Sequence, residues 1–88
     1  MAKEQPIPLT HLEPGQKGRI AAVDPDHQFH HRLADLGFVP GSEICVLRKA
    51  PLKDPIEYEV RNCRVCLRRS EAGCIYVFLQ AAALLKSK

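Results

Sequence analysis

Residues 56–69 read IEYEVRNCRVCLRR and predict a β-hairpin. Apolar and polar side chains alternate on both sides of Asn62-Cys63, which is typical of strands with one buried face. The inward positions are Ile56, Tyr58, Val60, Val65 and Leu67. A two-residue loop at Asn62-Cys63 would pair Val60 with Val65, Tyr58 with Leu67 and Glu57 with Arg68.

The same stretch contains a C-x-x-C sequence formed by Cys63 and Cys66. Three residues apart on a strand, their Cα atoms would be roughly 10 Å from each other, whereas a disulfide needs less than about 7 Å. A zinc knuckle would also need a second ligand pair, and Cys45 and Cys74 are single. We therefore expect two free thiols on the outside of the hairpin, no cofactor and no bound metal.

The segment 24–37 predicts the one internal helix. Asp24 or Asp26 is a suitable N-cap, and Gly37 is placed for a left-handed C-cap. The apolar stripe of this helix is Phe29, Leu33 and Leu36.

Histidines on this helix offer a second, weaker metal hypothesis. His27 and His31 are four residues apart, a spacing that can hold a metal on one helix face. No third ligand is evident, so we expect these two histidines, and His30 between them, to face water. A metal site drawn from His27, His31, Cys63 and Cys66 is the minor alternative.

Three further segments, 16–24, 42–49 and 74–79, predict strands, and Ser70 would cap a short helical turn at 70–73. Five short strands at close spacing and one helix in so small a chain favour a mainly β fold, a small β-barrel with short helical turns. We expect a flexible arm at residues 1–8, the barrel at 9–79 and a helical or frayed tail at 80–88. On the last strand, we expect Ile75, Val77 and Leu79 to face the core. We expect the tail to cover the apolar face made by Cys74, Tyr76 and Phe78, or that face to support weak self-association.

Composition narrows the function. The chain has 88 residues, 45% of them hydrophobic, and a formal net charge of +3, which is mild for a dedicated nucleic-acid binder. No apolar run approaches the roughly 20 residues of a membrane-spanning helix, and the N-terminus lacks the apolar core of a signal peptide. Sequence motifs of hydrolases, nucleotide-binding loops and zinc proteases are absent. We expect a cytoplasmic protein that is not an enzyme.

Several short motifs follow one another in a particular order. They are Leu33, Asp35-Leu36-Gly37, Pro40-Gly41, Arg48, Ala50-Pro51-Leu52, Asp54-Pro55-Ile56, Leu67-Arg68-Arg69 and Glu71-Ala72. In this order and spacing, the sequence resembles the ferrous iron transport protein A (FeoA) family over about residues 9 to 79. The resemblance implies an SH3-like small barrel. It also implies an accessory role, by protein–protein contact, beside the membrane transporter FeoB, which carries a cytoplasmic GTPase domain.

The partner implied by this resemblance is the cytoplasmic region of FeoB, with no direct membrane contact and no nucleic acid. We expect the contact surface at the loops 36–41 and 50–55, because prolines and glycines fix their backbones and leave little entropy to lose on binding. The candidate contact residues are Phe38, Val39, Ala50, Pro51, Leu52, Asp54, Arg68 and Arg69. Two alternatives stay open: a nucleic-acid-binding barrel, and a GTPase-activating partner that donates Arg68 or Arg69.

Overall fold

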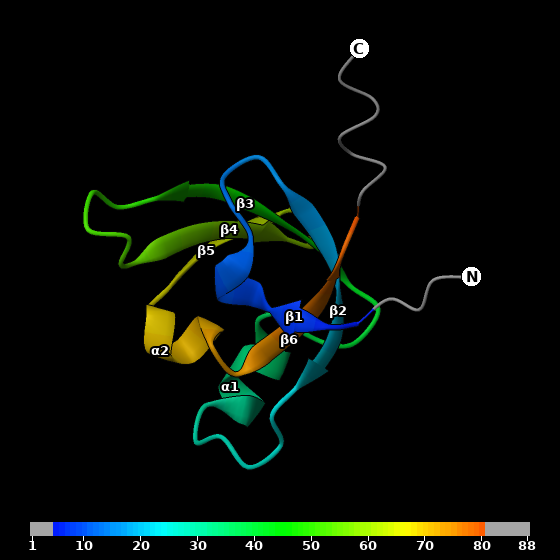
Figure 1. The fold of residues 1–88 in the computed structure, drawn as a ribbon. Helices are drawn as coiled ribbons and strands as arrows, with labels where there is room; N and C mark the ends of the chain where they lie inside the picture. Colours follow the sequence, from blue (N-terminus) through cyan, green and yellow to red (C-terminus); the bar gives the residue numbers. More distant parts are fainter. Residues whose placement is uncertain (1–4, 81–88) are drawn as a thin grey trace.

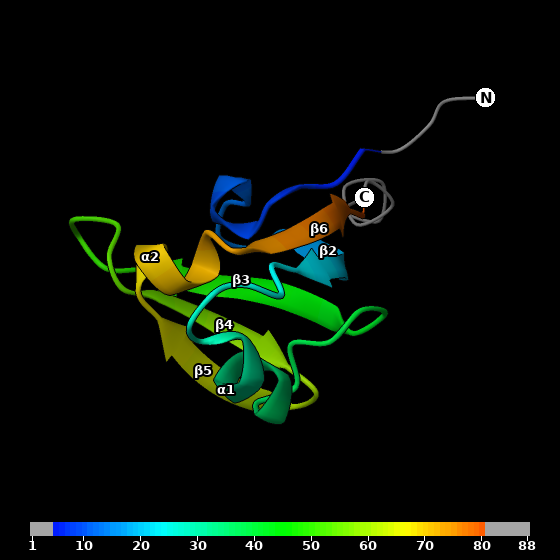
Figure 2. The ribbon, with the colours of Figure 1, turned by 90° about the horizontal axis from the view of Figure 1, so that it is seen from below.

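The computed structural model describes residues 5–80, in which six antiparallel strands form one curved sheet (Figure 1). Along the sheet the order is β1-β6-β2-β3-β4-β5, and Figure 2 shows β5 at one rim of this series. In chain order, the elements are β1 (Ile7–Pro8), the 3-10 helix η1 (Leu9–His11), β2 (Lys17–Val23), α1 (His30–Asp35), β3 (Glu43–Lys49), β4 (Ile56–Val60), β5 (Cys63–Leu67), α2 (Arg69–Ala72) and β6 (Ile75–Leu79).

The mainly β class is confirmed, with one more strand than the five expected. The extra strand is β1, whose two residues the sequence had assigned to the N-terminal arm. Ile7 pairs with Val77 and Pro8 with Tyr76 of β6. Proline is tolerated there because β1 is an edge strand, where its missing N–H costs no ladder hydrogen bond. Within the described residues, β1 and β5 do not pair with each other, so the barrel is open along that seam.

The core lies on the inner face of the sheet and confirms the alternation of the hairpin. Ile56, Tyr58, Val60 and Leu67 are buried, and Val65 is half-buried. Leu9 and Leu12, next to β1, close one end of this core, and Leu33 of α1 covers it. Among the described residues, no helix is long and apolar enough to cross a membrane.

The register of the hairpin differs from the expected one by two residues. The turn is Arg61-Asn62, with φ of 54° and 66°, and Val60 pairs with Cys63 rather than Val65. Both positive φ values fit a type I′ turn, which Asn62 favours, whereas a turn at 62–63 would force Cys63 into that conformation. Because the shift is an even number of residues, every side chain keeps its face.

The helix is much shorter than the expected 24–37. Residues 24–29 form turns instead, because side chains compete for the backbone donors. Asp24 Oδ1 accepts the N–H of Asp26 at 3.0 Å, and His27 Nδ1 accepts the N–H of Phe29 at 3.1 Å. Phe29, and neither aspartate, precedes the first helical residue. The third member of the expected stripe, Leu36, is exposed.

Gly37 ends α1 in the expected left-handed conformation, with φ of 107°. A Cβ atom on Gly37 would lie 2.9 Å from Cδ of Arg61, so the turn of the hairpin packs directly on this glycine. The turn at Gly37, after α1, directs Phe38 back toward the core. Its N–H donates to the carbonyl of Leu33 at 3.0 Å, and its side chain is buried.

The last strand buries a different set of residues from the one expected. Ile75 and Val77 are in the core, as predicted, but Leu79 is exposed. On the other face, Cys74 is buried, and only Tyr76 is clearly exposed. The tail segment expected to cover this face, residues 81–88, lies outside the described residues.

Tyr58 gives a first testable prediction, because it is fully buried and its hydroxyl has no hydrogen-bond partner among the described residues. Burying a hydroxyl without a partner is unfavourable, so we expect Tyr58→Phe to raise the free energy of unfolding at pH 7 by about 1 kcal/mol. Urea unfolding of both proteins measures this. A loss of stability of similar size would instead show that the hydroxyl is bonded, for example to water.

The same variant carries a pH dependence. Burial raises the pKa of Tyr58 above its ordinary value, and the charge of Arg69 opposes this shift. The pKa of Tyr58 is therefore higher in the folded protein than in the unfolded chain. The protonated hydroxyl makes its full contribution to the free energy of unfolding below about pH 10, and this contribution is lost as the pH rises further. Tyr58→Phe should therefore lose less stability than the parent protein between pH 9 and pH 11.

Candidate functional site

The loop between β3 and β4, residues 50–55, projects beyond the sheet and is the candidate site (Figure 1). Its ends are closed by a hydrogen bond from the N–H of Ala50 to the carbonyl of Pro55 at 3.0 Å. Inside it, the N–H of Lys53 donates to the carbonyl of Ala50 at 2.6 Å, and Lys53 has a φ of 67°. The loop is thus a defined turn, and its shape is fixed before any partner arrives.

Asp54 fastens this loop to the rest of the protein. Its Oδ1 accepts the backbone N–H of Arg69, the first residue of α2, at 3.0 Å. An N–H at the start of a helix has no partner within the helix, so a carboxylate there satisfies it. The sequence proposed Asp54 as a contact residue, and the structure places it as the link between the loop and α2.

Leu52 stands at the tip of the loop with 88% of its surface exposed, more than any other large apolar side chain in the described part of the chain. It borders an open hollow of about 570 Å³, here called the Leu52 hollow. The residues that line it are Thr10, His11, Glu13, Lys49, Leu52, Lys53 and Arg69. A large exposed leucine on a rigid loop can enter an apolar pocket of a partner with little loss of entropy.

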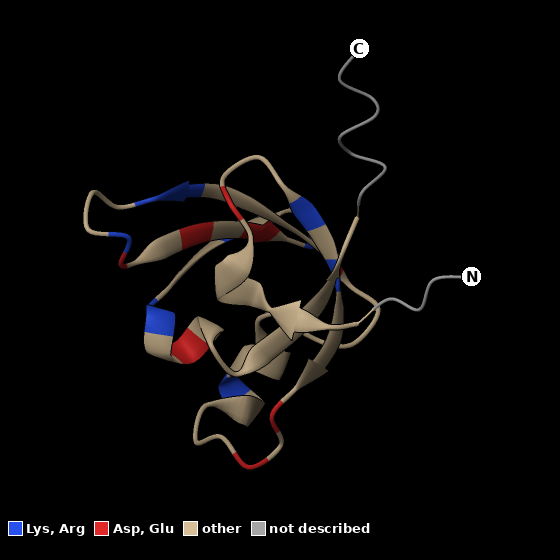
Figure 3. Cartoon of the chain, in the orientation of Figure 1, with Lys and Arg blue, Asp and Glu red and all other residues tan. Residues whose placement is uncertain are grey.

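The charge around this tip is positive. Lys53, Arg68 and Arg69 form no ion pair with any described residue, whereas Lys49 Nζ lies 3.5 Å from Glu13 Oε1. Figure 3 shows blue basic segments at the end of β3, in the loop and at the start of α2, with one red acidic segment also in the loop. The tip thus offers an apolar contact bordered by free cations, a combination that suits an acidic partner surface.

A second hollow, of about 290 Å³, lies on the other side of the loop and is called the Pro51 hollow. Its lining residues are Arg48, Lys49, Ala50, Pro51, Pro55, Glu57 and Cys66. Arg48 Nε and Glu57 Oε1 form an ion pair here at 2.9 Å. This pair replaces the expected pairing of Glu57 with Arg68, because in the observed register Glu57 lies opposite Cys66.

The structure separates the candidate contact residues into two groups. Ala50, Pro51, Leu52, Asp54, Arg68 and Arg69 gather at the end of β3. Phe38 and Val39 precede β3, so they lie at its other end, about 20 Å away for a seven-residue strand. Phe38 is 1% exposed, and its assignment as a contact residue is therefore wrong. The glycine that turns the chain after α1 points this aromatic ring into the core.

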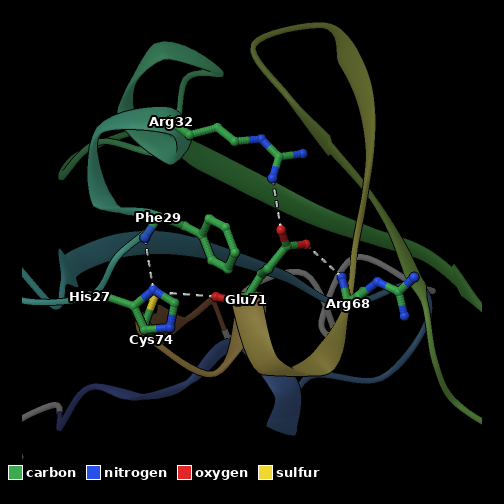
Figure 4. A network of polar contacts seen from close by, with 6 residues as sticks. All are labelled: His27, Phe29, Arg32, Arg68, Glu71 and Cys74. Carbon is green, nitrogen blue, oxygen red and sulfur yellow. Dashed lines mark hydrogen bonds and ion pairs between the residues drawn. The ribbon is translucent and has the colours of Figure 1, made fainter.

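Arg32 of α1 and Glu71 of α2 join the two helices behind the loop (Figure 4). Glu71 is buried on α2, and its Oε1 accepts the N–H of Arg68 while its Oε2 pairs with Arg32 Nη1, both at 2.9 Å. Arg32 comes from α1 and also lies over the ring of Phe29. Arg68 precedes α2 in place of the expected cap Ser70, so its guanidinium remains exposed while its backbone is held.

Cys74 lies beside this network. Burial, reinforced by the charge of Asp24, raises the pKa of its thiol. Its Sγ donates to the carbonyl of Glu71 at 3.1 Å. A protonated, hydrogen-bonded thiol is a poor nucleophile and metal ligand, so Cys74 is a structural residue.

The alternative metal residues do not converge. Within residues 5–80, no three His, Cys, Asp or Glu side chains are grouped as metal ligands would be. Cys63 and Cys66 are three apart on β5 and so point to opposite faces. His27 precedes α1, which removes the helical spacing to His31. His30, expected in water, instead has a buried Nδ1 without a partner.

One hollow was not expected from the sequence. It has a volume of about 410 Å³ and lies at the opposite end of β3 from the loop. Its lining residues are Lys17, Ser42, Glu43, Ile44, Cys45, Glu59, Arg61 and Asn62. Lys17, Cys45 and Glu59 stand side by side on three strands, an adjacency set by strand register. A correct register is the only sequence signal that could have indicated it.

The family model and a curated relative point to the same family. The FeoA domain family model matches residues 7–78. The chain is 38% identical over 71 residues to an Fe(2+) transport protein A/Fe(2+) transporter FeoB fusion protein of Porphyromonas gingivalis. That alignment covers 81% of this chain and 8% of the much longer fusion protein.

Solved structures show the same fold. A FeoA-like protein from Clostridium acetobutylicum superposes with a TM-score of 0.81 at 32% identity, covering 89% of this chain and 90% of that one. A zinc complex of FeoA from Stenotrophomonas maltophilia, described as an SH3 domain protein, gives a TM-score of 0.71 at 31% identity over 88% and 93% of the two chains. The expected SH3-like fold is therefore confirmed.

Proposed function

Since this chain belongs to the FeoA family of small proteins related to ferrous iron transport, we propose that it is a non-catalytic accessory protein of iron uptake that binds FeoB through the loop 50–55. Here FeoB means the cytoplasmic region of the transporter, and the protein acts from the cytoplasm. The observation that carries the site is Leu52, an almost fully exposed leucine on a loop held by backbone hydrogen bonds and by Asp54.

The fused relative supports the choice of partner. In that protein, a segment similar to this chain is part of the same polypeptide as FeoB. Covalent linkage raises the effective concentration of two modules that bind each other, which is an advantage when the affinity between them is modest. A module that serves this transporter by binding it needs a surface that recognises the transporter, and we assign that surface to the loop 50–55.

Replacing Leu52 by glutamate tests this proposal. We expect Leu52→Glu to weaken binding to the purified cytoplasmic region of FeoB about tenfold, because a charge replaces the apolar anchor. The free energy of unfolding of the Leu52→Glu variant should differ from that of the parent protein by less than about 0.5 kcal/mol, because the side chain of Leu52 is exposed. Titration calorimetry measures the affinity. The matched control Leu79→Glu changes another exposed leucine, at the end of β6 and outside both candidate loops, and should bind normally.

Two results of that experiment would count against the proposal. If Leu52→Glu binds as well as the parent protein, the loop is not the contact surface. If the parent protein does not bind the cytoplasmic region at all, the partner is wrong.

A second candidate function is stimulation of the GTPase domain of FeoB. The observation that favours it is that the guanidinium groups of Arg68 and Arg69 are exposed and unpaired among the described residues, beside the proposed contact. An arginine supplied by a partner can stabilise the charge of the phosphoryl-transfer transition state. Measuring GTP hydrolysis by FeoB with the parent protein and with Arg69→Ala distinguishes stimulation from binding alone.

A further inference from the structure

The free edge of β5 is one of two unpaired edges of the sheet, and the other belongs to the two-residue strand β1. β5 contacts only β4 in the sheet order, and Figure 2 shows it at the rim. In a two-residue hairpin the pair flanking the turn exchanges both hydrogen bonds, and bonded pairs then alternate along the ladder. Cys63, Val65 and Leu67 therefore bond to β4, while the N–H and C=O groups of Arg64 and Cys66 point to the open side.

These four backbone groups form a short template for another strand. No backbone group outside β5 bonds to Arg64 or Cys66 within the described chain. Both residues are exposed, so their backbones are accessible to a partner. The opposite edge of the sheet shows that such a short ladder is sufficient, because β1 pairs with β6 over only two residues. Nothing in β5 blocks pairing, since it contains no proline and only one charge.

The side chains along this edge specify what could pair there. Arg64 and the neighbouring Arg61 form no ion pair among the described residues, although Glu59 lies across from Arg64 on β4. An acidic residue placed beside Arg64 would compensate this charge. Two residues further along the partner strand, a side chain beside Cys66 would lie at the Pro51 hollow. There Ala50, Pro51 and Pro55 offer apolar contact.

We propose that the edge of β5 binds an extended, acidic segment of a partner protein by strand addition, with an acidic residue beside Arg64 and an apolar residue beside Cys66. Backbone hydrogen bonds to Arg64 and Cys66 supply affinity, and the two side-chain positions supply specificity. A second copy of this chain is a poorer occupant. Residues 63–67 contain no acidic residue, so pairing β5 with another β5 would bring arginines together without compensation.

The test uses the full chain, under reducing conditions, and a synthetic peptide. The probe is an acetylated peptide with Thr-Glu-Thr-Val repeated three times, which presents Glu and Val alternately on one face when extended. In the free protein, we expect the amides of Arg64 and Cys66 to exchange with solvent about tenfold or more faster than that of Val65. Saturating peptide should slow these two amides by a similar factor and leave that of Val65 unchanged.

Two peptides and three variants separate backbone pairing from other modes of binding. A peptide with lysine in place of glutamate should bind about tenfold more weakly to the parent protein, and Arg64→Glu should reverse this preference. A peptide with the same side chains but a methyl group on every backbone nitrogen should not bind, because it has no N–H donor for the ladder. Cys66→Pro removes a donor that the fold does not use, so it should remain folded and lose binding. Cys66→Ser keeps the backbone N–H and should still bind the peptide.

Several outcomes would overturn the proposal. The first is that the Thr-Glu-Thr-Val peptide shows no saturable binding. The second is that it protects only amides away from β5. The third is that Cys66→Ser loses as much binding as Cys66→Pro. Protection of Arg64 and Cys66 that grows with protein concentration, without peptide, would assign the edge to a second copy instead. The inference stands apart from FeoB binding, because Leu52→Glu should leave peptide binding intact.

Discussion

Phe38→Ala is expected to lower the free energy of unfolding by about 3–5 kcal/mol, the usual cost of emptying a buried aromatic site. Phe38 is one of the largest fully buried side chains, and the turn at Gly37 leaves it no second position. A small domain has a total stability of about 5–15 kcal/mol, so this loss is a large fraction of the total and the variant should unfold at a clearly lower temperature than the parent protein. Thermal unfolding followed by circular dichroism measures the effect.

The control for this prediction is Leu52→Ala, which truncates the exposed loop residue. It should change the free energy of unfolding by less than about 0.5 kcal/mol. The contrast tests the structural separation of two residues that the sequence had placed together as contact residues. A Phe38→Ala protein as stable as the parent would show that Phe38 is not part of the core.

Glu71→Ala is expected to cost about 2–3 kcal/mol, the second largest effect on stability. The carboxylate is buried and holds the N–H of Arg68 at the start of α2 with one oxygen and Arg32 with the other. Without it, this N–H has no partner, and α2 loses its connection to α1. Urea unfolding of the purified variant at pH 7 measures the loss.

Arg32→Ala tests which bond of Glu71 contributes more to the free energy of unfolding, the one to the N–H of Arg68 or the one to Arg32. The side chain of Arg32 is 58% exposed, so water can replace its partner, and we expect a cost below about 1 kcal/mol. Equal costs for Glu71→Ala and Arg32→Ala would contradict this view and assign the stabilisation to the ion pair. Because α2 also anchors Asp54, Glu71→Ala should weaken binding to FeoB more than Arg32→Ala does.

Local patterns were sufficient for five of the six strands, all but β1. Alternation in 56–61 and 64–69 placed Tyr58 and Leu67 in the core, because the side-chain period of a strand leaves only two faces. Gly37 also followed from local rules, since a left-handed helix end favours glycine. The order of short motifs identified the family, and with it the SH3-like barrel that the comparisons confirm.

The helix shows where local patterns were not sufficient. The stripe Phe29, Leu33 and Leu36 fits a helix over 24–37, yet α1 covers only six residues. Two contacts decided this: the N–H of Asp24 bonds to the carbonyl of Cys74, and His27 takes the N–H of Phe29. The first joins residues that are far apart in sequence, and a pattern of neighbours contains no information about it.

Some features of the candidate site also followed from the sequence, and others only from the tertiary structure. The sequence by itself determined that loop 50–55 is a fixed turn with an apolar tip, because proline and leucine have these properties wherever they occur. Only the tertiary structure decided that Phe38 is core, that Asp54 binds α2, and that Arg64 and Cys66 face an open edge. Each of these depends on register and on contacts between distant segments. Such contacts form only when the whole sheet closes around its core, so no stretch of sequence specifies them alone.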